Sequence, residues 1–435
     1  MVFWWFLLAL PSLVFLVIFS IDVVREGYLI FGKLDLIVLL LAILYLVMMP
    51  TFVRHRRTAM GWLAVMLVTL ASLVVAQGVA TRVVVRPAVD AFPWPPMRRV
   101  QEISPALVGI EGPSLFTVNR FGLRGREVES IHRPGSILCV GGSTTESLYV
   151  TDEKSWPWRL GELLSQREKR SIFVGNAGRS GHLVKHHTYL IEHYSLIESF
   201  EWIIVLAGVN DLGALLHQNR PQREARVASE TLFHRDRPNE ASYRRLALWR
   251  WMEMALDVGT PIAAGQILQD PRGNWIVERR KERARKLREN PRLEPPFELE
   301  ADLELYRQRL HELIQTARRK GCKILLLTQP TLWKEGLDPA LEAMLIEQTD
   351  DAAYSAGTLA AMMDRYNQVL RDTAEQNHCP IVDLARRMPT DRTLFYDDCH
   401  FHDAGSAWVA EILIDRLASE FSSSASAKPN VDAEN

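Results

Sequence analysis

From Ser136 onward, short apolar runs alternate with longer amphipathic stretches. The apolar runs have the length of strands and lack a polar face, which predicts parallel strands covered on both sides. We expect these strands at Ser136–Val140, Ser171–Gly175, Trp202–Ala207, Lys323–Thr328 and Pro380–Leu384. The amphipathic stretches predict helices at Trp156–Gln166, Val184–Glu198, Glu300–Lys320, Thr358–Asn377 and Ala404–Phe421. This alternation predicts an α/β fold, in which helices cover both faces of a parallel sheet.

The first 80 residues have a different character. Three apolar runs cover Val2–Val24, Leu36–Val53 and Met60–Ala80. Each is close to the roughly 20 residues that a helix needs to cross a bilayer. The first run has no basic leader and no clear small-residue cleavage site, so it does not resemble a cleaved signal peptide. We therefore expect residues 1–80 to form an anchor of three transmembrane helices.

Basic residues in the short loops predict the orientation of this anchor. The second loop contains Arg54, Arg56 and Arg57, whereas the basic residues of the first loop are balanced by acidic ones. The second loop is then cytoplasmic, and the chain after Ala80 lies outside, which in a bacterium with two membranes means the periplasm. Four arginines on the supposed outer side oppose this orientation: Arg82, Arg86, Arg98 and Arg99.

Charge and composition divide the remainder of the chain. The formal net charge of −1 gives no support to a nucleic-acid partner. Residues 81–118 are expected to form a proline-rich spacer and lead-in, residues 119–421 the main domain, and residues 422–435 a disordered tail.

Residues 212–299 interrupt the strand–helix alternation and are rich in charge, as in ERRKERARKLRE at 278–289. We interpret them as a solvated helical insertion; a lid or a basic surface for an anionic polymer or lipid headgroups is the alternative.

The four cysteines show no metal-binding pattern. Cys139, Cys322, Cys379 and Cys399 include no CxxC pair and no cluster with zinc spacing, so no metal site is expected. A disulfide between Cys322 and Cys379 is conceivable if their strands are neighbours, but free thiols are the favoured interpretation.

Polar motifs stand where the predicted strands end. Gly141-Gly142-Ser143 follows the first strand, and a glycine-rich segment that ends at Gly181 follows the second. Asn210 follows the third strand, and Asp397 to His400 precede the last helix. Carboxyl ends of parallel strands meet at one edge of a sheet, where ligands bind. Alone, Gly-Gly-Ser is also a common turn and could equally cradle a phosphate.

Together these groups could perform acyl transfer. A serine hydroxyl needs a base, and His400 can remove the proton of Ser143. Asp397 can fix the tautomer of His400, and Asp398 is the less suitable alternative. The N–H groups of Ser143 and Gly181 and the amide of Asn210 are candidate donors to an oxyanion. Gln329 and Trp333 follow the fourth strand and could line a pocket, whereas His402 is expected to be an exposed neighbour.

The order Gly-Gly-Ser, Asn-x-x-x-x-Gly, Gly-x-Asn-Asp and Asp-x-x-His resembles the four blocks of SGNH/GDSL hydrolases. The resemblance covers Asn119 to the final helix, and Asn119-Arg-Phe-Gly-Leu-Arg-Gly125 is similar to a lead-in of bacterial members. It implies a flavodoxin-like three-layer α/β/α domain, ester hydrolysis, and neither metal nor cofactor. It assigns the namesake positions to Ser143, Gly181, Asn210 and His400, with Asp397 as the triad acid. Gly142 stands where this family often has Asp, a residue outside the triad.

The leading hypothesis is therefore a membrane-embedded esterase that removes an O-acyl group from a lipid or carbohydrate on the outer face of the membrane. An O-acyltransferase that modifies a cell-surface polysaccharide would use the same acyl-enzyme. A non-catalytic scaffold of a membrane complex is a third hypothesis, which the complete set of chemical groups disfavours. Protein partners and substrate identity are not predicted.

Overall fold

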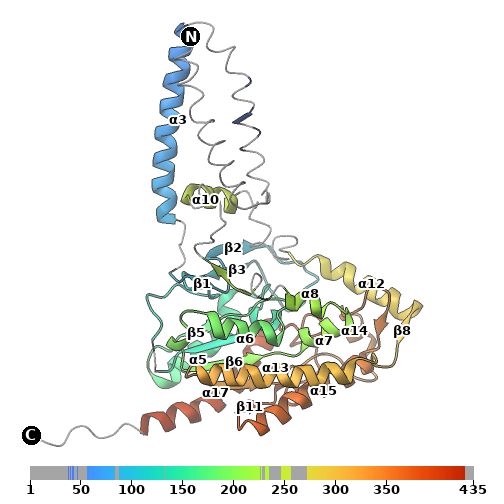
Figure 1. The fold of residues 1–435 in the computed structure, drawn as a ribbon. Helices are drawn as coiled ribbons and strands as arrows, with labels where there is room; N and C mark the ends of the chain where they lie inside the picture. The colour runs from blue at the N-terminus through green and yellow to red at the C-terminus, as the bar shows by residue number, and fades with distance from the viewer. Residues whose placement is uncertain are drawn as a thin grey trace, which may run out of the picture. The chain divides into compact units, whose positions relative to one another are not determined.

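The structure is a computed structural model that describes residues 56–83, 88–132, 134–225, 227, 231–234, 246–255 and 272–426, and positions 38, 40, 42, 43 and 47. The chain forms two compact units (Figure 1). The first consists of Met1–Arg86 and His234–Gln269, and the second of Pro87–Phe233 and Asp270–Asn435.

The described part of the first unit contains helices α3 (Arg56–Val83) and α10 (Ala247–Ala255). The backbone N–H of Leu248 donates to the side chain of Gln77 over 2.8 Å, and Ala80 packs against Ala247. The run predicted as a third span lies within α3, where Ser72 and Gln77 interrupt the apolar residues.

Within the described ranges, no helix combines the length and the apolar character that crossing a bilayer requires. The prediction of three transmembrane helices is thus not supported. The run at 2–24 lies outside the described residues, and so does most of the run at 36–53.

The second unit is built around a five-stranded parallel sheet. Its strands are β4 (Ile137–Gly141), β5 (Val174–Asn176), β6 (Trp202–Leu206), β9 (Lys323–Leu327) and β11 (Ile381–Val382). They lie in the order β11-β9-β6-β4-β5, and every adjacent pair is parallel. Counted along the chain this order is 2-1-3-4-5, that of flavodoxin-like folds. The predicted α/β fold with a parallel sheet is confirmed.

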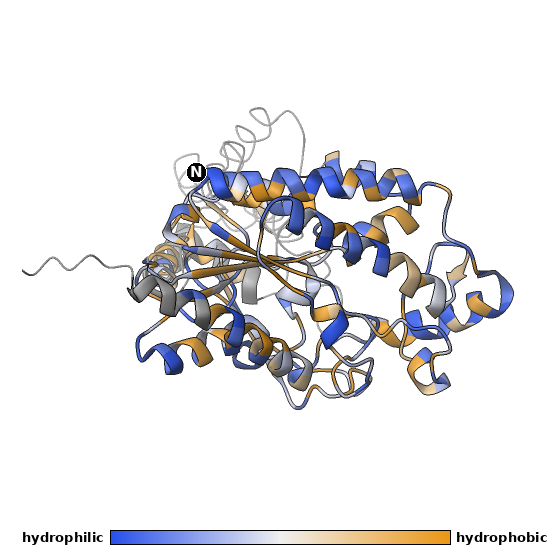
Figure 2. Cartoon of the chain, turned by 90° about the horizontal axis from the view of Figure 1, so that it is seen from below, coloured by the Kyte–Doolittle hydropathy of each residue, from blue (hydrophilic) through white to orange (hydrophobic). Residues whose placement is uncertain are grey.

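Helices cover both faces of the sheet, whose apolar strands lie between them in Figure 2. On one face α5 (Trp156–Glu168) packs against α17 (Asp403–Ser426). On the other, α13 (Leu299–Arg319) packs against α6 (Val184–His193) and α15 (Ala356–Gln376). Strands β4 and β6 are buried along their whole length, as the continuous apolar runs predicted. Helix α6 ends five residues earlier than expected because Tyr194 has extended backbone angles.

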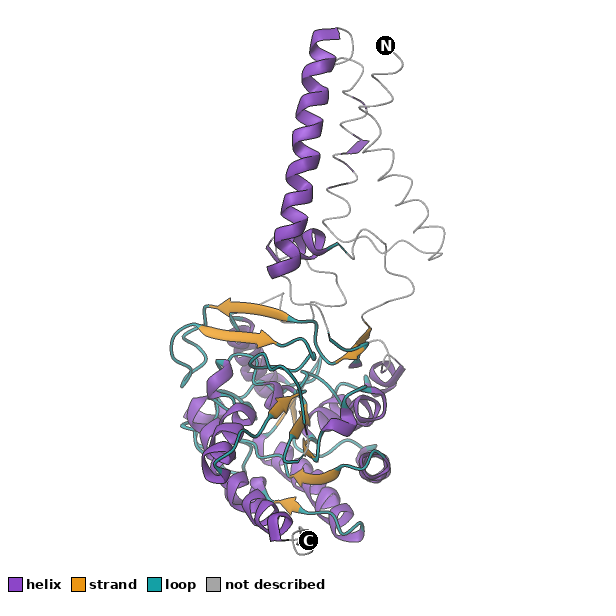
Figure 3. Cartoon of the chain, turned by 90° about the vertical axis from the view of Figure 1, so that its left-hand side faces the viewer, coloured by secondary structure: helices purple, strands orange, loops and turns teal. Residues whose placement is uncertain are grey.

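The proline-rich segment is part of the second unit and is not a spacer. Strands β2 (Met97–Gln101) and β3 (Ser114–Val118) form an antiparallel pair, visible in Figure 3, and β1 (Ala91–Phe92) precedes them. Phe92 belongs to the main hydrophobic core. Trp94 is also buried and donates from its indole N–H to the carbonyl of Gly178 over 3.1 Å. These apolar side chains tie the segment to the domain, which corrects the predicted boundary.

The insertion contributes α7 (Val209–Leu216), α8 (Arg220–Ala225), β7 (Phe233–His234), α12 (Trp275–Glu289) and β8 (Pro291–Arg292). Strand β8 pairs with β10 (Ala353–Tyr354). The charged helix α12 is solvated on one side only, because Arg283 and Lys286 are buried. The interpretation of this helix as a solvated surface element is therefore wrong for that side.

The remaining described elements are short: α4 (Ser143–Glu146), η1 (Asp152–Lys154), η2 (Ile197–Ser199), α14 (Pro339–Glu342) and α16 (Leu384–Arg387). At the C-terminus, α17 continues to Ser426, beyond the expected start of the tail, and residues 427–435 lie outside the described part.

Candidate active site

Ser143 is the first residue of α4, directly after β4 and Gly142. A side chain at Gly141 would meet the carbonyl oxygen of Leu206 at 2.6 Å, and one at Gly142 would meet the amide nitrogen of Asn210 at 2.1 Å. The backbone contact requires glycine at Gly141, whereas a side chain at Gly142 would require the end of the Asn210 side chain to move. As the first residue of a helix, Ser143 has a backbone N–H without an intrahelical acceptor, which makes it available to an anion.

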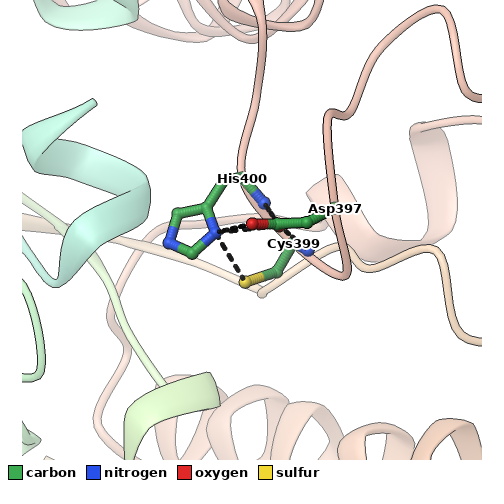
Figure 4. A group of neighbouring side chains, drawn as sticks. All are labelled: Asp397, Cys399 and His400. Carbon is green, nitrogen blue, oxygen red and sulfur yellow. Dashed lines mark hydrogen bonds and ion pairs between the residues drawn. The ribbon is translucent and has the colours of Figure 1, made fainter. Parts of the chain in front are cut away.

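His400 and Asp397 lie on the loop before α17, and His400 contacts Ser143. The Ser143 hydroxyl lies 2.6 Å from Nε2 of His400. On the other side of the ring, Nδ1 lies 2.8 and 2.7 Å from the two carboxylate oxygens of Asp397 (Figure 4). Asp397 also accepts backbone N–H groups of Cys399 and His400, at 3.1 and 2.9 Å, so its orientation is fixed. Asp397 thus holds the proton on Nδ1 and leaves Nε2 to accept the serine proton.

The pKa of His400 is set by opposing effects. Burial, the largest single effect, lowers the pKa. The charge and hydrogen bond of Asp397, together with those of Cys399, raise it by more in total, so that the pKa lies well above its ordinary value. The ring of Tyr396 stacks on the imidazole with 5.4 Å between centroids and 6° between planes. His400 is therefore a strong base that is held in one orientation.

The three expected oxyanion donors come from the ends of β4, β5 and β6. Gly181 adopts φ +75°, a conformation that glycine accepts easily. Asn210 stands in the first turn of α7, and its amide donates to the carbonyl of His182 over 3.1 Å. Because an amide has two N–H groups, a second donor remains beside Gly142. The structure brings Asn210 next to the serine turn, as the order of the strands requires.

Asp398 has a different environment from Asp397. Its carboxylate accepts the indole N–H of Trp333 and the backbone N–H of Ile346, both at 2.6 Å. Burial, followed by the charge of Asp397, raises the pKa of Asp398 to about 6. Asp398 is thus engaged away from His400, and Trp333 is one of its partners.

Two further expectations about neighbours change. Gln329 is buried, and its amide donates to the Pro330 carbonyl over 2.9 Å. His402, expected to be exposed, is buried and accepts the backbone N–H of Ala404 over 3.0 Å. The hydrogen bond of His402 is local, whereas Gln329 also accepts the hydroxyl of Thr144, the neighbour of Ser143, over 3.4 Å.

Sequence reasoning missed two buried charged residues behind the serine. The Arg124 guanidinium donates to Asp152 over 3.0 Å and to the carbonyls of Glu146, the last residue of α4, and of Ser147 and Val150 beyond it. The carboxylate of Glu146 accepts both the backbone N–H and the hydroxyl of Ser180, next to Gly181. The sequence could have drawn attention to Arg124, because this residue lies in the lead-in motif Asn119–Gly125. No feature of the sequence indicated the role of Glu146.

A metal is a weak alternative for this site. Ligand atoms of Asp397, Cys399 and His400 lie within 4.8 Å of one another. However, Nδ1 of His400 is already engaged by the carboxylate, and burial raises the pKa of the Cys399 thiol to about 11. A protonated thiol is a poor ligand. All four cysteines are free, so the conceivable disulfide between Cys322 and Cys379 is absent.

The chain matches one protein family and is distantly similar to several solved structures. Residues 139–408 match the GDSL-like lipase/acylhydrolase family. Similar solved structures include LAE5, an alpha/beta hydrolase enzyme from the metagenome of Lake Arreo, Spain, at 15% identity and a TM-score of 0.36, covering 66% of this chain and 96% of that one. The acetyl xylan esterase AlAXEase has 14% identity and a TM-score of 0.35, covering 65% and 99%. Axe2, an acetylxylan esterase from Geobacillus stearothermophilus, has 15% sequence identity and a TM-score of 0.35. The match covers 66% of this chain and 95% of Axe2. No curated protein matches the sequence.

The structural similarities are distant, whereas the family match covers more than half of the chain and all the motif positions. The chain therefore belongs to the GDSL-like lipase/acylhydrolase family.

Proposed function

We propose that the protein is a serine esterase in which Ser143, His400 and Asp397 form the catalytic triad. The observation that carries the proposal is the continuous hydrogen-bond line from Asp397 through His400 to Ser143, with end contacts of 2.7 and 2.6 Å. The distances lie within the reach that a nucleophile and its base require.

The geometry supports a two-step reaction. Ser143 Oγ attacks the ester carbonyl carbon while Nε2 of His400 takes the hydroxyl proton. The carbonyl oxygen becomes negatively charged near the N–H groups of Ser143 and Gly181 and the Asn210 amide. When the intermediate collapses, the C–O bond to the alcohol breaks and His400 protonates the alcohol. Water then attacks the acyl-enzyme with His400 again as base, and the carboxylic acid leaves.

The experiment is hydrolysis of p-nitrophenyl acetate by the full chain, together with labelling by a fluorophosphonate probe. We expect activity and labelling in the wild type and neither in Ser143→Ala. A matched control is Ser165→Ala, which removes a hydroxyl on α5. In the part of the chain that the structure describes, this hydroxyl bonds to the carbonyls of Gly161 and Ile172 and to the N–H of Ile172. A Ser143→Ala protein that is still active would refute the triad, and an inactive wild type would favour a scaffold.

The natural substrate that we propose is an O-acylated lipid or carbohydrate outside the cytoplasm. Support comes from the sequence: Arg54, Arg56 and Arg57 precede the second unit and favour a cytoplasmic position for that segment. Reporter fusions after Arg56 and after Pro96 test the sidedness. Product analysis with an acylated glycan tests the substrate class, and acyl transfer to a sugar hydroxyl in excess of hydrolysis would replace the esterase by a transferase.

A further inference from the structure

Helix α12 of the insertion is fastened to backbone carbonyls of the domain by three basic side chains on one side. Arg283 donates to the carbonyls of Glu347 and Tyr354 over 3.0 and 3.1 Å, and Lys286 donates to that of Thr349 over 2.8 Å. Arg280, one turn earlier, donates to the carbonyls of Met344, Ala106 and Tyr396. Residues three apart lie on the same side of a helix, so these side chains form one row.

Arg280 joins three segments of the domain, and one of them is the catalytic loop. Its guanidinium donates to the carbonyl of Tyr396 over 2.6 Å, to that of Ala106 over 2.9 Å and to that of Met344 over 3.2 Å. Tyr396 directly precedes Asp397. A guanidinium offers five N–H groups in a fixed plane, which suits it to hold several carbonyls at once.

The segment that Arg280 holds on its other side also contacts the catalytic loop. Backbone N–H groups of Ile346 and Glu347 donate to the carboxylate of Asp398, at 2.6 and 3.3 Å. Arg280 thus binds the residue before Asp397, and the segment of Ile346 and Glu347 binds the residue after Asp397. The loop is fixed on both sides of the triad acid.

The charge of Arg280 acts on the same loop. All three of its hydrogen-bond acceptors are neutral carbonyls, and within the described residues it forms no ion pair. Burial lowers the pKa of Arg280, whereas the charges of Asp397 and Asp398 raise it. The cation therefore lies within electrostatic reach of Asp397, the carboxylate that bonds to His400.

We infer that Arg280 is a positioning residue for the proposed esterase reaction: it fixes the Asp397–His400 loop and its positive charge tunes the base. The inference rests on the proposed triad and goes beyond it, because the residue belongs to the insertion and not to the four motifs. The insertion then completes the catalytic machinery.

The first measurement is the pH dependence of kcat/KM for p-nitrophenyl acetate. Neutral His400 is the active form, so activity rises as the imidazolium loses its proton. Removal of a nearby cation stabilises the imidazolium, and in Arg280→Met we expect the rising limb to move to higher pH by roughly 0.5 to 1 unit. The plateau of kcat/KM should fall roughly 10- to 100-fold as the loop loses its fixed geometry.

Other titratable groups act on the loop as well, and they are unchanged by this substitution: Asp398, Cys399, Tyr396, Tyr149, Glu146, Glu347 and Arg283. Comparison of variants with the wild type therefore isolates the contribution of Arg280.

Two further variants separate charge from geometry. Arg280→Lys keeps the charge, so the rising limb of its pH profile should stay at the wild-type pH. Its plateau value of kcat/KM should lie between those of Arg280→Met and the wild type. Arg285→Met makes the same truncation on the exposed side of α12 and should resemble the wild type. Among the described residues, Glu289 is the ion-pair partner of Arg285. If Arg280→Met does not fold, Arg280→Gln, which keeps donors but no charge, replaces it with the same expected shift.

Two results would overturn the inference. One is a rising limb at the wild-type pH in Arg280→Met, with the same loss of kcat/KM in Arg280→Met and Arg280→Lys, which would leave Arg280 a structural role only. The other is wild-type kinetics in Arg280→Met. The proposed function itself fails by a different result, namely absent fluorophosphonate labelling of the wild type or persistent labelling of Ser143→Ala.

Discussion

Replacement of Arg124 by Met should destabilise the catalytic unit strongly. The side chain is 1% exposed, and its ion pair with Asp152 is equally buried. Truncation leaves that carboxylate with its remaining donors from Thr117 and removes the donors to the carbonyls of Glu146, Ser147 and Val150.

The magnitude follows from the uncompensated charge. Breaking a buried ion pair by removing one partner costs about 3 to 5 kcal/mol. For a domain of this size that corresponds to a fall in Tm of roughly 6 to 10 °C. The loss should be visible in thermal unfolding followed by circular dichroism at pH 7. Labelling by a fluorophosphonate should also slow below Tm, because the carbonyls hold the end of the helix that carries Ser143.

A double-mutant cycle sharpens this prediction. Asp152→Asn removes the charge that Arg124 compensates, so the combined variant should be more stable than Arg124→Met alone. Arg120→Met is the matched control, because Arg120 is 45% exposed and pairs with Glu127 at the surface, where an ion pair contributes little. A Tm of Arg124→Met close to that of Arg120→Met, or a double variant no more stable than the single one, would refute the reasoning.

The remaining predictions concern the site and one buried carboxyl group. Asn210→Ala should lower kcat of ester hydrolysis about 100- to 1,000-fold with little change in Tm, and a loss below about threefold would remove Asn210 from the oxyanion site. Asp397→Asn should lower kcat about 10,000-fold, because the amide no longer selects the required tautomer of His400, and near-normal kcat would exclude Asp397 as the triad acid. Burial raises the pKa of Asp211 to about 6, although Arg220 opposes the change. Its ionisation then opposes folding, so between pH 5 and 7 its contribution to stability should decline by about 1 kcal/mol as pH rises. Asp211→Asn should lack this decline, and parallel pH–stability curves for the two proteins would contradict the assignment.

The sheet could be predicted because its signal is local. Strand β6 was expected at Trp202–Ala207 and lies at Trp202–Leu206, since a buried strand needs a continuous apolar run. The position of the site followed as well: the strand order places the ends of β4, β5 and β6 together, and with them Ser143 and Asn210. The glycines of the serine turn are explained by contacts with distant residues, but their presence was visible in the sequence.

The partners of charged residues could not be predicted in the same way. The run ERRKERARKLRE gave no indication that Arg283 would be buried. Two of its acceptors are backbone carbonyls of residues 347 and 354, which any sequence possesses, and the third is the distant carboxylate of Glu342. Glu146 likewise acts through the N–H of Ser180. The apolar runs before residue 80 met the length criterion of a bilayer span, yet within the described residues no helix meets the combined criteria of length and hydropathy.

The distance along the chain between the proposed nucleophile and its proposed base has a consequence for biosynthesis. Ser143 and His400 are 257 residues apart, and the loop of His400 is held in place on one side by α17, which packs against α5. A ribosome that has completed β4 and α4 has produced a serine with no base. The hydroxyl remains unreactive until the last strand and helix have emerged and docked. The order of the motifs therefore delays the appearance of a reactive nucleophile until nearly the whole catalytic unit has been synthesised.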